Sequence, residues 1–178
     1  MYKEKKICVV VPAYNEELLI QNVVRTMPSF VDKIIVVNDS STDATLCKLE
    51  ELLPIFKNKL SVVSHEVNSG VGASITTGYK ESLRLGMDIS CVMAGDAQMD
   101  PEELPLMIEP IISGAADYVK GNRLNRYIFY PTVNHVKPHQ QIIGITVSLI
   151  HKVKVNMLQY IISYGGVSGL RIRDMPIT

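Results

Sequence analysis

The chain has 178 residues, 47% of them hydrophobic and 20% charged, which is enough for one globular domain with a sizeable core. Its formal net charge of zero argues against nucleic-acid binding, because phosphate backbones require a basic surface. No run reaches the roughly 20 apolar residues that span a bilayer, and the N-terminus lacks a signal-peptide cleavage site. Three widely spaced cysteines are expected to be buried free thiols, which indicates a cytoplasmic protein.

Apolar runs alternate with segments of helical spacing. Strands are predicted at 7–11, 33–37, 60–64, 89–93 and 116–120. Helices are predicted at 16–27, from Ser41 or Thr42 to residue 53, at 72–86, and from Asp100, which caps a helix with Pro101 in its first position. This alternation predicts an α/β fold, an open and mostly parallel sheet with helices on both faces and right-handed crossovers.

Polar residues follow three of these strands, at the edge where an open α/β sheet binds nucleotides. The segments are VVVPAYNEE (9–17), IIVVNDSSTDAT (34–45) and CVMAGDAQMDPEELP (91–105), and a glycine-rich turn, VNSGVGASITTGYK (67–80), leads into a helix. Neither GxGxxG after the first strand nor GxxxxGK[ST] occurs, so a dinucleotide turn and a P-loop are excluded. Asp96 and Gln98 can instead hold a divalent cation that bridges a diphosphate, although Asp96 capping a turn is the alternative.

In their order and spacing, these four segments resemble the signature segments of glycosyltransferase family 2, which has the Rossmann-like GT-A fold. ADYVKGNR (116–123) resembles the segment that closes the donor site in the polyprenyl-phosphate sugar transferase branch. The resemblance covers roughly residues 6–125. We therefore divide the single domain, 1–178, into a nucleotide-sugar-binding core, 1–125, and an atypical segment, 126–178, that is either native or a truncated acceptor side.

The resemblance also implies roles for the matching residues. Pro12, Ala13 and Tyr14 would contact the nucleobase, with Glu16 nearby. Asp39 would contact the base or ribose. Gly70 and Gly72 would let the backbone approach the ligand closely, although a tight turn explains them equally well. Asp96 and Gln98 would hold Mg²⁺ or Mn²⁺. Arg123 would contact the donor phosphates.

The activity implied is that of an inverting glycosyltransferase, which moves a sugar from a UDP- or GDP-sugar to polyprenyl or dolichyl phosphate in cell-envelope glycan synthesis. Three departures from the family pattern bear on it. Ala94 stands at the first position of the family's DxD pair, and Val71 stands where relatives often carry a basic residue. The chain also has no ED pair, which supplies the general base in many inverting members. An anionic phosphate acceptor needs no such base, and a truncated acceptor half explains the absence equally well.

Two alternatives belong to other classes. A nucleotide-sugar-binding member without turnover accommodates Ala94, whereas a nucleotidyltransferase would need a GxGxRxxP-type loop after the first strand, which is absent.

Residues 139–164 read as an apolar and basic helix, either in the core or on the cytoplasmic face of a membrane. An incomplete acceptor half would leave apolar surface for a homo-oligomer. The four histidines lack metal-ligand spacing and are expected at the surface or in turns.

Overall fold

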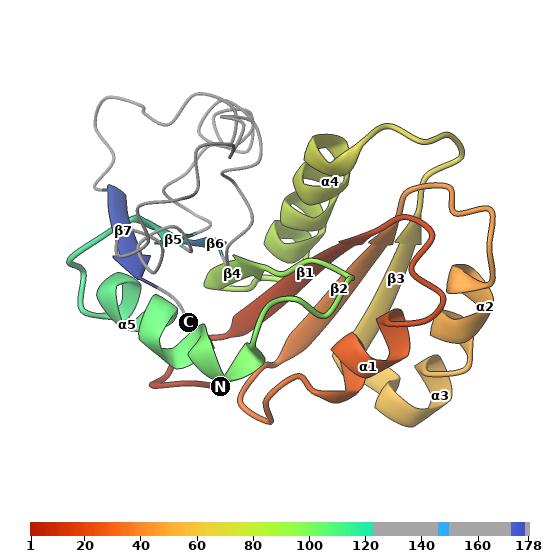
Figure 1. The fold of residues 1–178 in the computed structure, drawn as a ribbon. Coiled ribbons are helices and arrows are strands. Elements are labelled where there is room, and N and C mark those ends of the chain that lie inside the picture. Colours follow the sequence, from red (N-terminus) through yellow and green to blue (C-terminus); the bar gives the residue numbers. More distant parts are fainter. Residues whose placement is uncertain (123–145, 150–171, 177–178) are drawn as a thin grey trace, which may run out of the picture.

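The computed structural model describes residues 1–122, 146–149 and 172–176. Within these residues, seven strands form one sheet in the order β3-β2-β1-β4-β6-β5-β7 (Figure 1). The strands are β1 (Ile7–Ala13), β2 (Lys33–Asn38), β3 (Leu60–Ser64), β4 (Ile89–Val92), β5 (Tyr118–Asn122), β6 (Thr146–Leu149) and β7 (Ile172–Pro176). The helices are α1 (Ile20–Arg25), α2 (Thr45–Glu50), α3 (Leu53–Phe56), α4 (Val71–Arg84) and α5 (Leu104–Ile112), with 3₁₀ turns η1 (Lys57–Lys59) and η2 (Pro101–Glu103).

The centre of the sheet is parallel and buried on both faces. Strands β3, β2, β1 and β4 pair in parallel, and Val10 of β1 lies opposite Ile35 on one side and Val92 on the other. Val9 and Val11 join one buried cluster, while Val10 joins the cluster on the opposite face. Successive side chains of a strand point to opposite faces, so a strand covered on both sides is apolar throughout, as the β1 sequence is.

Helices cover both faces, as the sequence predicts. Helix α4 lies over one face, where Ile75 and Tyr79 pack in the cluster that contains Val10 (Figure 1). The opposite face is covered by α1, α2 and α5, which contribute Ile20, Val23, Val24, Leu49, Leu104, Met107, Ile108 and Ile111 to the larger cluster. The predicted open, mostly parallel α/β sheet is therefore confirmed.

The β4 side of the sheet departs from the prediction. The fifth predicted strand does not continue the parallel series, because β6 lies between β4 and β5 and is antiparallel to both. Residues 146–149 were expected to be helical, which is wrong, since Thr146–Leu149 form β6. Their sequence, TVSL, alternates polar and apolar residues, and the free edge of β4 offers backbone hydrogen-bonding groups that a strand satisfies. The other residues of the predicted 139–164 helix lie outside the described part.

Several smaller expectations meet a clear outcome. Asp100 caps the turn before α5, since its Oδ1 accepts a hydrogen bond from the Glu102 N–H at 2.9 Å. Neither Ser41 nor Thr42 caps α2, because the helix begins later: Ala44 is at its N-cap. Helix α1 also begins later than residue 16, at Ile20, because residues 16–19 form a turn first.

The cysteine prediction is partly wrong. Cys8 and Cys91 are buried free thiols, but Cys47 is exposed on α2. Burial raises the pKa of the Cys8 thiol to about 12, which keeps it protonated and unreactive. In the described ranges, no helix has the length and apolarity needed to cross a membrane.

Candidate functional site

The carboxyl ends of β1 and β4 define the switch point of the sheet. The chain runs from β1 to β2 and β3 on one side and returns to β4 on the other. Ligands of open α/β sheets bind in the crevice at such a point. A cavity of about 220 Å³ lies there, lined by Pro12, Ala13, Tyr14, Glu16, Asp39, Val71, Ser74, Ala94 and Gly95. The structure thus brings together five of the predicted donor-site residues, from Pro12 to Asp39.

The turn after β1 is held by the loop after β2. The Glu16 N–H donates to Thr45 Oγ1 at 2.8 Å, and the Asn15 N–H donates to Ser41 Oγ at 3.0 Å. These bonds fix the backbone directly after Tyr14. Tyr14 itself is 48% exposed and lines the cavity, so its aromatic side chain is accessible to a ligand there.

Asp39 is the most constrained polar residue of the site. It is only 3% exposed, and its Oδ1 accepts hydrogen bonds from the Ser69 N–H at 2.9 Å and from His65 Nδ1 at 2.7 Å. Its Oδ2 accepts from the Gly70 N–H at 2.7 Å. Burial alone would raise the pKa of Asp39, but the hydrogen bonds from Ser69, His65 and Gly70 outweigh it, so the pKa lies below its ordinary value. Asp39 is therefore a buried carboxylate whose ionised form the fold stabilises.

His65 is a site residue that sequence reasoning missed. It was expected at the surface or in a turn, yet its side chain is only 16% exposed and bridges Asp39 to Thr77 Oγ1 of α4, which lies 2.9 Å from Nε2. The residue before it, Ser64, ends β3, and β3 pairs with β2, which ends one residue before Asp39. Only this strand pairing brings the two side chains together, so no local sequence pattern could have identified His65.

The two predicted glycines lie at the start of α4. Gly70 is its N-cap, with φ +85° and ψ 163°, a conformation that only glycine adopts readily, and Gly72 is in the first helical turn. Their neighbours Val71 and Ser74, rather than the glycines, line the cavity. The geometry of Gly70 supports the tight-turn explanation for that position.

The predicted cation ligands lie on the loop after β4. Asp96 Oδ1 accepts a hydrogen bond from the Gln98 N–H at 3.1 Å, which is the turn-capping contact considered for it, and Ala97 between them has φ +57°. Burial raises the pKa of Glu16, and the Asp96 and Asp43 carboxylates raise it further. Two acidic side chains of the site, Glu16 and Asp96, therefore repel each other electrostatically. The described ranges contain no cluster of three or more His, Cys, Asp or Glu side chains that could hold a metal ion.

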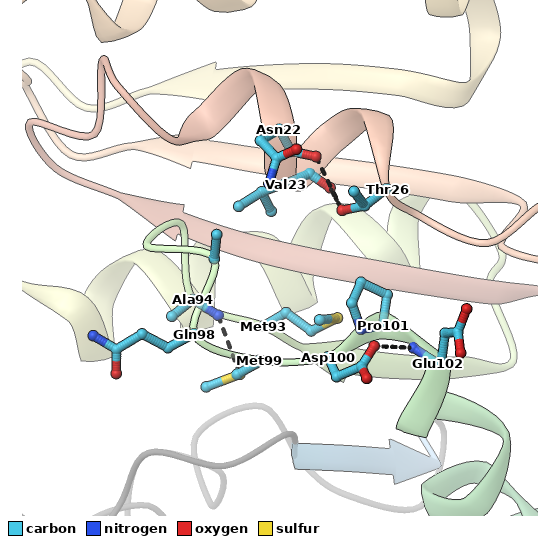
Figure 2. A pocket seen from close by; sticks show the side chains of 11 residues that line it. Asn22, Val23, Thr26, Met93, Ala94, Gln98, Met99, Asp100, Pro101 and Glu102 are labelled. Carbon is cyan, nitrogen blue, oxygen red and sulfur yellow. Dashed lines mark hydrogen bonds between the residues drawn. The ribbon is translucent and has the colours of Figure 1, made fainter. Parts of the chain in front are cut away.

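A larger cavity, of about 490 Å³, lies between this loop and α1 (Figure 2). Its lining residues are Asn22, Val23, Thr26, Met93, Ala94, Ala97, Gln98, Met99, Asp100, Pro101 and Glu102. Ala94 lines both cavities, whereas Gln98 lines only the larger one. The larger cavity has two acidic side chains in its lining and no basic one, so it is a poor site for a diphosphate. Arg123, the predicted phosphate contact, lies outside the described residues.

An open α/β sheet with a cavity at its switch point defines the class of Rossmann-like α/β proteins. Within that class, the chain belongs to Glycosyl transferase family 2, which it matches over residues 8–172. The predicted family is therefore confirmed.

Individual relatives are consistent with this family. The chain is 37% identical over 133 residues to the UDP-N-acetylglucosamine–dolichyl-phosphate N-acetylglucosaminyltransferase of Methanococcus voltae, covering 68% of this chain and 53% of that protein. It is 31% identical over 134 residues to the dolichol-phosphate mannosyltransferase of Pyrococcus furiosus, covering 70% of this chain and 37% of that protein. The chain thus spans about half or less of the length of these relatives.

Among solved structures, the fold is similar to that of glucosyl-3-phosphoglycerate synthase from Mycobacterium tuberculosis in complex with Mn²⁺, UDP and glucosyl-3-phosphoglycerate. The TM-score is 0.62 at 19% identity, and the match covers 98% of this chain and 71% of the other. At this identity the likeness establishes the shared fold alone.

Proposed function

We propose that this protein is an inverting glycosyltransferase that moves a sugar from a UDP- or GDP-sugar to a polyprenyl or dolichyl phosphate. The single observation that carries the proposal is the convergence of Tyr14, Glu16 and Asp39 on one cavity at the switch point of the sheet. Family membership and the two relatives named for dolichyl-phosphate sugar transfer support the reaction class and the acceptor.

In the proposed donor complex, the nucleobase lies between the turn after β1 and Asp39. The half-exposed Tyr14 ring stacks on the base, and the Asp39 carboxylate accepts a hydrogen bond from the base or ribose. Pro12 and Ala13 form the wall behind the base. Arg123, by resemblance to relatives, contacts the donor phosphates.

A divalent cation, Mg²⁺ or Mn²⁺, is the cofactor that we propose for the loop after β4, by analogy with the Mn²⁺ complex of the structurally similar synthase. Asp96 and Gln98 are the proposed ligands, and Glu16 adds a further carboxylate whose raised pKa reflects burial and the charge of Asp96. Oxygen donors with an excess of negative charge suit a hard dication, which would offset that repulsion. When bound, such a cation supplies charge neutralisation for a leaving diphosphate.

The acceptor chemistry is consistent with the missing ED pair. A phosphate oxygen of the lipid acceptor, already anionic, attacks the anomeric carbon from the face opposite the diphosphate. The new carbon–oxygen bond forms as the bond to the diphosphate breaks, the bonding electrons leave with the diphosphate, and the configuration inverts. Because no proton is removed from the acceptor, no protein base is required.

A second candidate is a nucleotide-sugar-binding protein without turnover. The specific observation in its favour is Ala94, which places a methyl group where the family carries the first carboxylate of its DxD pair. A site with one carboxylate fewer binds a cation more weakly, and the short span relative to the relatives leaves the acceptor side open.

Calorimetric titration of UDP and GDP, each with and without Mn²⁺, tests the donor site in the wild type and in Asp96→Ala. We expect one nucleotide to bind in a Mn²⁺-dependent manner, with the dependence lost in the variant. Asp100→Asn is the matched control, because Asp100 lies on the same loop but caps the turn before α5. Sugar transfer to a polyprenyl phosphate then separates the enzyme from the binding protein. Binding of neither nucleotide would eliminate both candidates.

A further inference from the structure

The hydrogen bonds of Asp39 leave one acceptor position for a ligand. A carboxylate offers about four lone-pair positions, two on each oxygen. Oδ1 accepts from the Ser69 N–H and from His65, and Oδ2 accepts from the Gly70 N–H. Among the described residues, the remaining position is on Oδ2. Since Asp39 also lines the 220 Å³ cavity, this position is the one available to a group bound there.

His65 fixes which oxygen remains available. A carboxylate only accepts hydrogen bonds, so the His65 Nδ1 that lies 2.7 Å from Oδ1 carries the proton and donates. On the neutral ring, Nε2 then accepts from the Thr77 hydroxyl, 2.9 Å away on α4. The ring is thus held at both nitrogens, between the end of β3 and the side of α4. Without it, Oδ1 would regain an open position, and among the described residues the carboxylate would be held by the backbone N–H groups of Ser69 and Gly70 alone.

We infer that His65 is a positioning residue of the nucleobase site, which orients Asp39 so that a single acceptor position on Oδ2 receives a ring N–H of the base. This inference rests on the proposed function and specifies the donor more narrowly. Uracil and guanine carry a ring N–H on the pairing edge. Cytosine carries an unprotonated ring nitrogen there, whose lone pair would face the carboxylate. Asp39 therefore selects uridine or guanosine diphosphates against cytidine diphosphate.

Two substitutions separate positioning from simple packing. His65→Ala removes both ring contacts, whereas His65→Asn retains an amide N–H close to the position of Nδ1. If His65 orients Asp39 by donating to it, asparagine restores nucleotide binding. If the ring only fills space beside α4, asparagine, which is much smaller, restores little. Thr77→Val tests the hydrogen bond between the Thr77 hydroxyl and His65 Nε2, because it removes the hydroxyl and keeps the shape of the side chain.

The test is calorimetric binding of UDP, GDP and CDP in the presence of Mn²⁺, with melting temperatures measured on the same samples. We expect the wild type to bind CDP at least about tenfold more weakly than the better of UDP and GDP, and the UDP and GDP arms identify the base. For that base, His65→Ala should weaken binding about tenfold, His65→Asn by less than about threefold, and Thr77→Val by about threefold.

The outcomes that overturn the inference are distinct. CDP binding as tight as UDP and GDP binding would overturn the role of Asp39. Unchanged affinity in His65→Ala, or equal losses in His65→Ala and His65→Asn at equal melting temperatures, would overturn the role of His65 while leaving the proposed function intact. Absence of binding by all three nucleotides in the wild type would overturn the proposed function and this inference together.

Discussion

The residues proposed to bind the nucleobase and those proposed to bind the cation are held differently. On the β2 side, Asp39 is buried and accepts three hydrogen bonds, from His65, Ser69 and Gly70. On the β4 side, Gln98 is exposed, and the Asp96 side chain accepts one hydrogen bond, from the Gln98 N–H. The backbone N–H of Ala94 donates to the sulfur of Met99, a weak acceptor, at 3.4 Å. Among the described residues, more hydrogen bonds thus hold the base side than hold the loop proposed to bind the cation.

The largest expected effect is on the base side. Asp39→Asn keeps the shape but replaces one acceptor oxygen by an NH₂ group, which faces an N–H donor. We expect the free energy of unfolding at neutral pH to fall by about 3 kcal/mol, because buried donors lose their charged acceptor. Denaturant unfolding of the wild type and the variant measures this difference. A loss below about 0.5 kcal/mol would contradict the view that Asp39 organises the start of α4.

The same variant carries a pH signature. Because the pKa of Asp39 is lowered in the folded state, the unfolded state binds its proton first, and the stabilisation is complete above the unfolded pKa of about 3.9. It is lost as the pH falls through the lower folded pKa. The difference in unfolding free energy between wild type and Asp39→Asn should therefore be constant from about pH 5 to about pH 7 and should shrink below about pH 4. A difference that grows on acidification would contradict this sign.

The second effect concerns the contact between α4 and β1, which supports the base side. A Cβ added at Gly78 would lie 2.1 Å from Val10 Cγ1, and Val10 is fully buried and β-branched. We expect Gly78→Ala to destabilise the protein by about 2 kcal/mol, because overpacking outweighs the better helix propensity of alanine. The melting temperature should fall by roughly 4–8 °C.

Val10→Ala provides the control for this contact. Alone, it should destabilise the protein by removing buried methyl groups, but combined with Gly78→Ala it makes room for the new Cβ. The double variant should therefore be more stable than the sum of the two single effects predicts, by about 1 kcal/mol or more. Strict additivity would show that the two positions do not touch in solution.

The third prediction distinguishes backbone strain at Gly70 from steric crowding by neighbouring atoms at the start of α4. A Cβ at Gly70 would meet no atom within 4 Å, yet its φ of +85° and ψ of 163° disfavour any other residue. Gly70→Ala should cost about 1.5 kcal/mol and weaken nucleotide binding, because the Gly70 N–H moves away from Asp39. Gly72→Ala, two residues later and within the helix, is the matched control and should be neutral or slightly stabilising. Equal effects at the two positions would refute this distinction.

The smallest effect is expected on the cation side. Ala97 has φ +57°, in the left-handed region that glycine tolerates without cost. Ala97→Gly should change the free energy of unfolding by about 0.5 kcal/mol in the stabilising direction, since relief of the backbone strain slightly exceeds the added entropy of the unfolded chain. Urea unfolding measures it. Destabilisation above about 1 kcal/mol would mean that the loop is packed as firmly as the base side, and the contrast would disappear.

Much of the fold was accessible from the sequence because the relevant signals are local. The β-branched runs located β1 to β4 to within a residue or two, since strands such as β1 and β2, which are buried on both faces, are largely apolar. The cap at Asp100 could also be predicted, because the capping carboxylate and the N–H that donates to it lie only two residues apart. The position of β6 and the first residue of α1 could not be predicted from the sequence. Backbone groups at a free strand edge or in a turn form hydrogen bonds with whichever segment reaches them, and that segment can lie far away in the sequence.

The sequence by itself determined the family, the α/β architecture and the gathering of Pro12, Tyr14 and Asp39 at one sheet edge, because strand ends and turn residues are encoded within short segments. Only the tertiary structure decided that His65 and the start of α4 hold Asp39, and that Asp96 and Glu16 interact while Gln98 lines a separate cavity. These contacts join residues far apart in the chain. They depend on the strand order and on how closely α4 packs on β1, which no local pattern specifies.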